Sequence, residues 1–330
     1  MLDIACLQRI RLSRRPLSQR LVAKILDFNY GVYPGVTIDM VNAEQVPDEQ
    51  VIFAMNHTDR FNYFPFQLRW KDLRNRFTAT WVKGKYYEHP LSAKFMEWTS
   101  NLPTVSRGYI ISRDFMAITG RRPSKEEYRV VRNWVNETAR GKRAEPSAPI
   151  PTALLETPRS ILGRPFAPSD ELYCDAINGT YEEMMREFTR LNERVFETGL
   201  DLLVFPEGTR SIRLSRGRPG IAHIACHTKR TIVPVGCSGS DKVYPGSSPM
   251  ARKGHISYRF GAPIPYEEYS SWAPDVAFAP FSAKAEHDHG EAFQSISDLI
   301  MERINTLVDP DYRFDDSLSS QGVQGVSRFL

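Results

Sequence analysis

Two short polar segments, each placed directly after an apolar run, contain the side chains best suited to chemistry. The first spans residues 56–62, reads NHTDRFN and follows the apolar run 51–55. Its histidine, His57, titrates near neutral pH, so the imidazole can take a proton from a hydroxyl and return it. A polar residue a few positions later can hold Nδ1–H and leave Nε2 free as the base. A histidine that merely caps the turn after a strand is the structural alternative.

The second segment spans residues 205–211, reads FPEGTRS and also lies at the end of an apolar run. A tight turn at Gly208 brings backbone N–H groups, a hydroxyl and the guanidinium of Arg210 together. This set suits a phosphate, because the fork of an arginine matches phosphate oxygens in pairs. More arginines follow at positions 213, 216 and 218, so the surroundings are strongly positive. The alternative is a plain strand-to-helix turn beside a solvated run of charge.

Both segments need a sheet that places them at one edge. In the first two thirds of the chain, apolar runs alternate with helical patterns, which predicts βαβ units, an α/β fold and a mostly parallel sheet flanked by helices. The expected strands are 51–55, 77–82, 103–107, 200–205, 231–235 and 255–260. A side chain at the carboxyl end of a buried parallel strand lies where α/β folds bind ligands.

Helix signals come from capping residues and from periodic apolar positions. Capping boxes predict two helix starts, one at Ser124 with Glu127 and one at Thr180 with Glu183. Gly199 is expected to end the second of these helices. The last helix is expected at 291–307, after a solvated loop that includes the sequence HDH at 287–289. The segment 141–170 contains six prolines and little periodicity, so we expect an irregular excursion over the surface.

The composition is that of an ordinary globular protein: 330 residues, of which 41% are hydrophobic and 25% charged. This excludes wholesale disorder and coiled coil.

No apolar run approaches the roughly 18 residues that a spanning helix needs, and the arginine-rich N-terminus lacks the apolar core of a secretory signal. The four cysteines form no close CxxC pair, which argues against a disulfide scaffold or zinc ribbon and favours the cytoplasm. Basic residues are not interleaved with aromatic ones in a known module, so we expect no nucleic-acid partner.

The small net charge of +4 is concentrated at one end of the chain, where residues 1–30 carry six basic side chains against two acidic ones. Within this region, apolar residues recur with helical spacing at Leu17, Leu21, Ile25 and Phe28. A basic amphipathic helix of this kind can lie on an anionic membrane surface. It can equally dock its apolar stripe on the protein core, and the sequence leaves both interpretations open.

Four blocks of residues occur in order along the chain. His57 stands in the pattern NHxxxxD, with Asn62 at its last position; Lys83, Pro90 and Arg107 form the second block; FPEGTRS at 205–211 is the third; and IVPV at 232–235, with Pro234, is the fourth. Arg218 and Gly220 lie between the last two blocks. In these features the sequence resembles the glycerolphosphate and lysophospholipid acyltransferase family, over roughly residues 50–107 and 180–265.

The resemblance implies an acyl transfer and assigns roles to individual residues. His57 would act as general base on the hydroxyl of the acceptor, which attacks the thioester of acyl-CoA or acyl-carrier protein. The phosphate and glycerol portion of the acceptor would be held by Glu207, Gly208, Thr209 and Arg210. Lys83 and Arg107 would add positive charge there, and Pro234 would shape the pocket wall. The resemblance implies no metal and no cofactor.

Lysophosphatidic acid is the leading acceptor, and a peripheral position on the cytoplasmic face of the membrane is expected, since substrate and product are amphiphiles. Glycerol 3-phosphate and an aminolipid remain open as other acceptors. A non-catalytic lipid-binding homologue also remains open.

The position of the family's acidic partner holds Asn62 instead of aspartate. An asparagine can orient an imidazole but cannot stabilise the imidazolium by charge, which can cost several orders of magnitude in rate. Three states therefore remain open: an active His–Asn pair, rescue by Asp59 or another carboxylate, and a catalytically weak site. We expect some activity, because the anion-binding segment at 205–211 is intact.

The spacing between the second and third blocks is longer than the family needs. We expect an insertion at about 108–178, which could lid the acyl channel, contact a carrier protein, touch the membrane or have no catalytic part. The expected division is a basic helical segment at 1–35, an acyltransferase domain at 36–308 and a loosely held tail at 309–330.

Two other groups of residues have alternative interpretations. His223, Cys226 and His227 have metal-ligand spacing on a helix, although a core helix is the expectation there. Aromatic residues gather around the second block at Trp81, Tyr86, Tyr87, Phe95 and Trp98. They could line an acyl tunnel, lie at a membrane interface or pack in the core.

Overall fold

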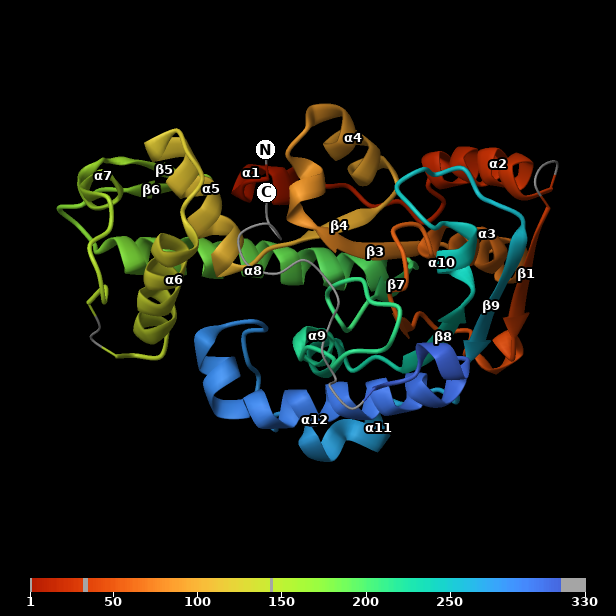
Figure 1. Cartoon of the computed structure of the whole chain (residues 1–330). Helices are drawn as coiled ribbons and strands as arrows, with labels where there is room; N and C mark the ends of the chain where they lie inside the picture. Colours follow the sequence, from red (N-terminus) through yellow and green to blue (C-terminus); the bar gives the residue numbers. More distant parts are fainter. Residues whose placement is uncertain (1, 32–34, 143–144, 316–330) are drawn as a thin grey trace.

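A seven-stranded sheet forms the centre of the molecule (Figure 1). The computed structural model describes residues 2–31, 35–142 and 145–315. The strand order is β1-β9-β8-β2-β7-β3-β4, and the strands from β8 through β4 run parallel to one another. β9 pairs antiparallel with β8, and β1 pairs parallel with β9. The fold is therefore α/β with a mostly parallel sheet, as the sequence predicts.

The strands of this sheet are β1 (Val36–Val41), β2 (Ile52–Met55), β3 (Thr78–Lys83), β4 (Asn101–Thr104), β7 (Asp201–Val204), β8 (Ile232–Ser238) and β9 (Gly254–Phe260). The helices are α1 (Ile4–Arg9), α2 (Leu17–Gly31), α3 (Tyr63–Arg74), α4 (Pro90–Trp98), α5 (Arg107–Thr119), α6 (Lys125–Ala139), α7 (Thr152–Glu156), α8 (Tyr173–Glu197), α9 (Gly220–Thr228), α10 (Ser240–Val243), α11 (Tyr266–Tyr269) and α12 (Ala283–Leu307).

Helices cover both faces of the sheet. Side chains alternate between the two faces along each strand, so a strand of apolar residues presents apolar side chains to the helices on both sides. In β2, Ile52 and Ala54 belong to a hydrophobic cluster that also contains residues of α8, α9 and α12. Phe53 and Met55 belong to a second cluster, shared with α2 and α3. A strand buried on both faces reads as a continuous apolar run, which is why 51–55 could be recognised from sequence.

In the seven-stranded sheet, most of the predicted strands are confirmed, with one shift and one omission. The strands expected around 51–55, 77–82, 200–205, 231–235 and 255–260 correspond to β2, β3, β7, β8 and β9. The strand expected at 103–107 lies earlier, at β4, and Arg107 opens α5 instead. Ser106 caps that helix by accepting a hydrogen bond from the N–H of Tyr109, so the chain turns helical before Arg107. β1 was not predicted.

The capping box of Ser124 and Glu127 is confirmed at the start of α6. The one predicted at Thr180 is wrong, because α8 already begins at Tyr173 and the hydroxyl of Thr180 donates to the carbonyl of Ala176 inside the helix. The solvated loop predicted at 287–289 is also wrong. Ser282 caps α12 ahead of it, so these residues lie within the helix.

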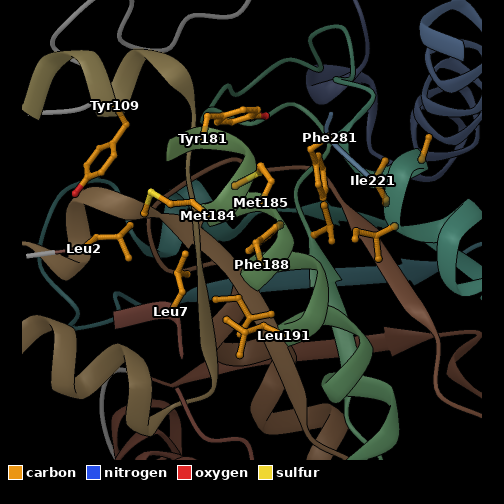
Figure 2. Packing of buried hydrophobic residues seen from close by; sticks show 14 of the residues in the cluster. Leu2, Leu7, Tyr109, Tyr181, Met184, Met185, Phe188, Leu191, Ile221 and Phe281 are labelled. Carbon is orange, nitrogen blue, oxygen red and sulfur yellow. The ribbon is translucent and has the colours of Figure 1, made fainter. Parts of the chain in front are cut away.

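The expected basic segment 1–35 contains two helices with different environments. α1 is buried against α8, and Figure 2 shows Leu2 and Leu7 packed on the side of α8 that carries Met184 and Leu191. The backbone N–H of Ile4 also donates to the carbonyl of Leu162 over 3.0 Å. The boundary at 35 is therefore wrong for α1, which belongs to the core of the main domain.

α2 turns its apolar stripe outward. Leu17, Leu21, Ile25 and Phe28 are 59–77% exposed. The opposite face, which includes buried Ala23 and Leu26, packs on α3. The interpretation in which the apolar stripe docks on the core is therefore wrong. Among the described residues, no helix combines the length and the apolar character needed to cross a bilayer.

The proline-rich part of the insertion is more regular than expected. It contains α7 and a hairpin of β5 (Arg159–Ile161) and β6 (Arg164–Phe166). The guanidinium of Arg159 donates to both carboxylate oxygens of Asp114 in α5, over 2.8 and 2.6 Å. The hydroxyl of Tyr173 in α8 donates to the same carboxylate over 2.9 Å. The hairpin is thus fixed to α5 and α8 by a buried polar network, while residues 143–144 lie outside the described chain.

The beginning of the predicted loose tail is held in place. The hydroxyl of Tyr312 donates to the carboxylate of Asp241 over 2.6 Å and accepts the N–H of Gly239 over 3.0 Å. Because Tyr312 is buried by these contacts, the expectation is wrong for residues 309–315. Residues 316–330 of the predicted tail lie outside the described residues.

Candidate active site

The predicted catalytic segments meet at one edge of the sheet. β7 lies between β2 and β3, and all three strands run in the same direction. Their carboxyl ends are therefore neighbours. His57 follows β2, the Gly208 turn (residues 205–211) follows β7, and Lys83 ends β3.

His57 has a fixed tautomer because its partner is itself fixed. Nδ1 of His57 lies 3.1 Å from Oδ1 of Asn62. The Nδ2 group of Asn62 donates to the carbonyl of Asn56 over 2.9 Å, so only the amide oxygen faces the imidazole. Nδ1 must then carry the proton, which leaves the lone pair of Nε2 available. The ring of Phe205 stacks on the imidazole with 4.1 Å between centroids and holds its plane.

Asp59 does not replace the missing acid. Its carboxylate accepts the hydroxyl of Thr58 over 2.9 Å and the backbone N–H of Phe61 over 2.7 Å. The pKa of Asp59 is raised by burial, which opposes its charge. Both oxygens are engaged by residues of their own loop, so Asn62 is the partner of His57 and rescue by Asp59 is wrong.

His57 is neutral at physiological pH. Burial lowers the pKa of the imidazole to about 3, and the positive charges of Arg210 and Lys83 act in the same direction. The hydrogen bond to Asn62 works against this shift. A neutral imidazole with a free Nε2 is the form that can accept a proton from a hydroxyl.

Glu207 faces the protein interior, although the sequence assigned it to the acceptor. Its side chain is 1% exposed. One carboxylate oxygen accepts the backbone N–H of His57 over 3.1 Å, and the other accepts the N–H and hydroxyl of Ser215 over 3.2 and 3.1 Å. Burial raises the pKa of Glu207 to about 7. The carboxylate therefore fixes the loop of His57 to the Gly208 turn, and its assignment as an acceptor ligand is wrong.

The Gly208 turn is closed by backbone contacts. Gly208 has a φ of 66° and donates its N–H to the carbonyl of Phe205 over 3.0 Å. A side chain there would also meet Arg218, whose Cδ lies 2.9 Å from the place of a Cβ. The N–H of Ser211 donates to the carbonyl of His57 over 2.9 Å, and Thr209 is buried within the turn. These contacts fix where the side chain of Arg210 leaves the backbone.

Two cations near Arg210 were missed in the sequence. The pKa of Lys85 is lowered, first by burial and then by the positive charges of Arg210 and Arg60. Arg60 and Arg210 are therefore both within electrostatic range of Lys85, and Arg210 is also within range of His57. Their positions in the sequence could have indicated a role at this site, because Arg60 lies inside the first block and Lys85 is two residues after Lys83.

Arg107 was expected at the phosphate but contacts the insertion. Its Nε donates to Oδ1 of Asn178 over 2.8 Å, and its guanidinium lies 4.3 Å from the ring centre of Tyr181. Nη1 is also 3.6 Å from the carboxylate of Glu286 in α12. A cavity of about 350 Å³ adjoins Arg107 and is lined by side chains of α6 and α12. Arg107 is thus held by contacts with α8 and α12, and its role at the phosphate stays a prediction.

Pro234 was expected in the pocket wall, yet it lies in the interior of β8. It is in register with Ala54 of β2 and is buried, and its carbonyl accepts the N–H of Gly261 over 2.9 Å. Its contacts are within the sheet, because a central position of β8 is covered on both faces. The pocket-wall assignment of this proline stays a prediction.

The residues with metal-ligand spacing are engaged in other contacts. Nδ1 of His223 accepts the N–H of Phe281 over 3.1 Å, and Nε2 of His227 lies 2.7 Å from the carboxylate of Glu193. In the part of the chain that the structure describes, no group of three or more histidine, cysteine or acidic side chains is arranged to hold a metal ion. α9 packs as a core helix, with His223 buried.

The aromatic residues near the second block divide between the core and the surface. Trp81 donates its indole N–H to Asn192 over 2.8 Å, and Tyr87 is fully buried. Phe95 and Trp98 in α4 are exposed. Trp81 and Tyr87 therefore pack in the core, while Phe95 and Trp98 lie on the surface beside α2.

Comparisons with known proteins agree with the resemblance. The family model described as Acyltransferase matches residues 173–238. A curated 1-acyl-sn-glycerol-3-phosphate acyltransferase from Cocos nucifera is 33% identical over 89 residues, which are 26% of this chain and 28% of that protein. The chain therefore spans little more than a quarter of that relative's length. Among solved structures, the 1-acyl-sn-glycerophosphate (LPA) acyltransferase PlsC from Thermotoga maritima is 12% identical with a TM-score of 0.39, covering 85% of this chain and 78% of that one.

The matched segment contains β7, the Gly208 turn and β8. The first block, which carries His57, lies outside it in sequence but is joined to it by the hydrogen bonds of Glu207 and Ser211. Over residues 173–238 this chain is therefore similar to the Acyltransferase family, and the four ordered blocks extend that similarity to the segment of His57.

Proposed function

We propose that this protein is an O-acyltransferase that moves a fatty acyl group from an acyl thioester to the hydroxyl of a lysophospholipid, with lysophosphatidic acid as the leading acceptor. One observation supports this most directly: a neutral His57, oriented by Asn62, lies beside the cations Lys83 and Arg210. A base next to an anion site suits an acceptor that carries both a hydroxyl and a phosphate.

In the proposed reaction, Nε2 of His57 takes the proton of the acceptor hydroxyl while its oxygen attacks the thioester carbonyl carbon. The carbon–sulfur bond then breaks, the acyl group remains on the oxygen as an ester, and the imidazolium returns its proton to the departing thiolate. Asn62 holds Nδ1–H throughout and keeps Nε2 directed at the reacting oxygen. The thioester supplies an activated carbonyl, so we propose no covalent acyl-enzyme and no cofactor.

The anion site would hold the acceptor through its phosphate. Arg210 and Lys83 provide the charge, and the Gly208 turn provides the rigid backbone from which Arg210 projects. Fixing the phosphate places the glycerol hydroxyl at the base, and such positioning is a major source of rate enhancement. The donor is acyl-CoA or acyl-carrier protein.

We propose that the protein binds peripherally to the cytoplasmic face of a membrane through a surface formed by α2 and α4. Figure 1 shows these two helices along the same side of the molecule. They touch where Gln19 donates its amide to the carbonyl of Thr99 over 2.7 Å. Exposed apolar side chains project from both helices, including Leu21 in α2, and Leu91 and Trp98 in α4.

The charges around this surface support an anionic lipid bilayer as its partner. Arg14, Arg15, Arg20 and Lys24 are exposed on or before α2, and Lys94 lies 5.6 Å from the ring centre of Trp98. Basic residues beside exposed apolar ones are typical of interfacial helices. The 3₁₀ helix η2 (Gly84–Tyr87) leads from the anion site almost directly into α4, so a lipid could keep its chain in the bilayer while its phosphate reaches the site.

The experiment for the proposed function measures CoA release from a long-chain acyl-CoA with lysophosphatidic acid, for the wild type and for His57→Ala. Release that requires both the acceptor and His57 supports the acyltransferase. Release is expected to fall by about a hundredfold or more in the variant, because general base catalysis contributes at that scale. Acyl-carrier protein as donor, and glycerol 3-phosphate and an aminolipid as acceptors, are tested in parallel. Tight lipid binding without turnover for every pair would contradict the proposal and identify a lipid-binding protein.

A further inference from the structure

Three cations converge from three neighbouring strand ends. Arg60 lies in the loop between β2 and α3, Arg210 in the turn after β7, and Lys85 in η2 directly after β3. Because β7 is the middle strand of the three, Arg210 emerges between the other two. All three side chains are partly buried at this edge.

These cations lack acidic partners. Within residues 2–31, 35–142 and 145–315, no ion pair involves Arg60, Lys85 or Arg210, although most of the other partly buried arginines have one, such as Arg159 with Asp114. The Nε of Arg60 is also buried without a hydrogen-bond acceptor. Holding unpaired cations together in a partly buried place is unfavourable unless a ligand supplies negative charge.

An unpartnered hydroxyl lies next to the same loop. Ser211 is 4% exposed, and its Oγ has no hydrogen-bond partner. Its backbone N–H is bonded to the carbonyl of His57, which places the residue beside the base. Buried polar groups are rarely left without a partner, so this hydroxyl also indicates a ligand at the site.

The amount of positive charge distinguishes between headgroups. Lys83 and Arg210 alone suffice for the single charge of a phosphodiester. A phosphate monoester carries about −1.5 to −2 at neutral pH, so additional cations favour it. A choline or ethanolamine headgroup would place its own positive charge among these side chains, and such repulsion is an effective way to reject a competing ligand.

We propose that Arg60 and Lys85 extend the anion site of Lys83 and Arg210 and make it selective for a phosphate monoester over phosphodiester headgroups. Both residues occupy variable positions within the first two blocks, which assign no role to either of them. The proposal rests on the proposed function for the identity of the acceptor, and its central claim is the discrimination between one and two negative charges at this edge of the sheet.

The first test compares acceptors that share one acyl chain: lysophosphatidic acid, lysophosphatidylglycerol and lysophosphatidylcholine. In the variant Arg60→Gln/Lys85→Gln, kcat/KM for lysophosphatidic acid is expected to fall by about tenfold to a hundredfold, mainly through KM, as expected for lost charged hydrogen bonds. The preference over the two diesters should narrow by a similar factor. An unchanged preference would overturn the proposal.

Two further variants separate specific from general effects. Arg122→Gln/Lys125→Gln removes the same two charges from exposed positions of the insertion and should leave the preference unchanged. Arg60→Lys/Lys85→Arg keeps both charges and should retain most of the preference for lysophosphatidic acid that Arg60→Gln/Lys85→Gln loses. A retained preference would show that charge, and not a defect in folding, caused the loss, whereas a lost preference in a folded protein would count against the proposal.

A binding measurement keeps this inference independent of turnover. By calorimetry, His57→Ala should bind sn-glycerol 3-phosphate more tightly than glycerophosphocholine, and the additional Arg60→Gln/Lys85→Gln change should remove the difference. If the wild type transfers no acyl group but this difference is present, the proposed function fails while the monoester site stands. Equal binding of both probes overturns the monoester site whatever the outcome for catalysis.

Discussion

The side-chain amide of Asn62 is held between two partners, with its nitrogen donating to the carbonyl of Asn56 over 2.9 Å and its oxygen 3.1 Å from Nδ1 of His57. The first contact requires a donor and the second requires an acceptor. A carboxylate would supply two acceptors and would place one of them against the Asn56 carbonyl. This site is therefore built for an uncharged partner of the histidine.

Asn62→Asp is expected to lower stability without raising kcat. Asn62 is fully buried, so the lost hydrogen bond and the two facing oxygens should cost about 1–3 kcal/mol at neutral pH. Protonation of the new carboxyl restores a donor toward Asn56, so the deficit relative to the wild type should shrink as the pH falls. Urea denaturation at several pH values and steady-state rates check both points. A variant that is faster and equally stable would show that the wild-type site lacks a carboxylate it needs.

Glu207→Gln is expected to lower kcat by about tenfold or more while the acceptor KM stays within about twofold. Glutamine offers one acceptor oxygen where His57 and Ser215 require two, so the catalytic loop should lose its exact position. Arg210→Gln should behave in the opposite way, with the larger effect on the acceptor KM. Steady-state kinetics with varied acceptor distinguishes the two patterns. A raised KM with unchanged kcat in Glu207→Gln would return Glu207 to the acceptor site.

As the pH falls through about 6.5, the ordinary pKa of a histidine, kcat should not decrease. His57 works as a base only when neutral, and burial together with Arg210 and Lys83 lowers its pKa to about 3. Since protonation occurs only as the pH falls through this lowered value, kcat should hold from pH 8 to below pH 6. When the acceptor is bound, its phosphate offsets the charges of Arg210 and Lys83, so the pKa of His57 in the complex is higher than in the free enzyme. Burial, the largest cause of the lowered pKa, remains in the complex.

Arg210→Gln provides the matched measurement for this pH effect. Removing one positive charge lessens the downward shift of the His57 pKa, so the acid limb of kcat/KM should move to higher pH than in the wild type. Rates with saturating and with limiting acceptor separate the complex from the free enzyme. A wild-type limb at the ordinary histidine value in both profiles would contradict the burial of the base.

The exposed face of α2 is expected to control membrane binding. Leu21→Ser/Ile25→Ser/Phe28→Ser should abolish sedimentation with vesicles of mixed zwitterionic and anionic lipid while leaving the melting temperature nearly unchanged, because these side chains make few contacts with the protein. Val276→Ser, at a residue that is 68% exposed elsewhere on the surface, is the matched control and should bind normally. Undiminished vesicle binding by the triple variant would exclude α2 as the anchor.

Much of the candidate site is local and could be predicted. The apolar run of β2 followed by His57, and the run of β7 followed by the Gly208 turn, are complete within a few residues each. The strand periodicity also determined that both lie at carboxyl ends, since parallel strands share an edge. The amphipathic pattern of α2 was likewise readable, but it does not say which way the apolar stripe faces.

By itself, the sequence determined the fold class, most central strands and the pairing of a base with an anion-binding turn, because these depend on residues close together in the chain. Only the tertiary structure decided that Glu207 bonds to His57, that Arg107 bonds to Asn178, and that α1 enters the core while α2 faces outward. Each of these depends on a contact between segments tens to hundreds of residues apart, or on the lack of one. Burial and hydrogen-bond satisfaction act on the assembled neighbours, and no local pattern of residue types specifies which neighbours those are.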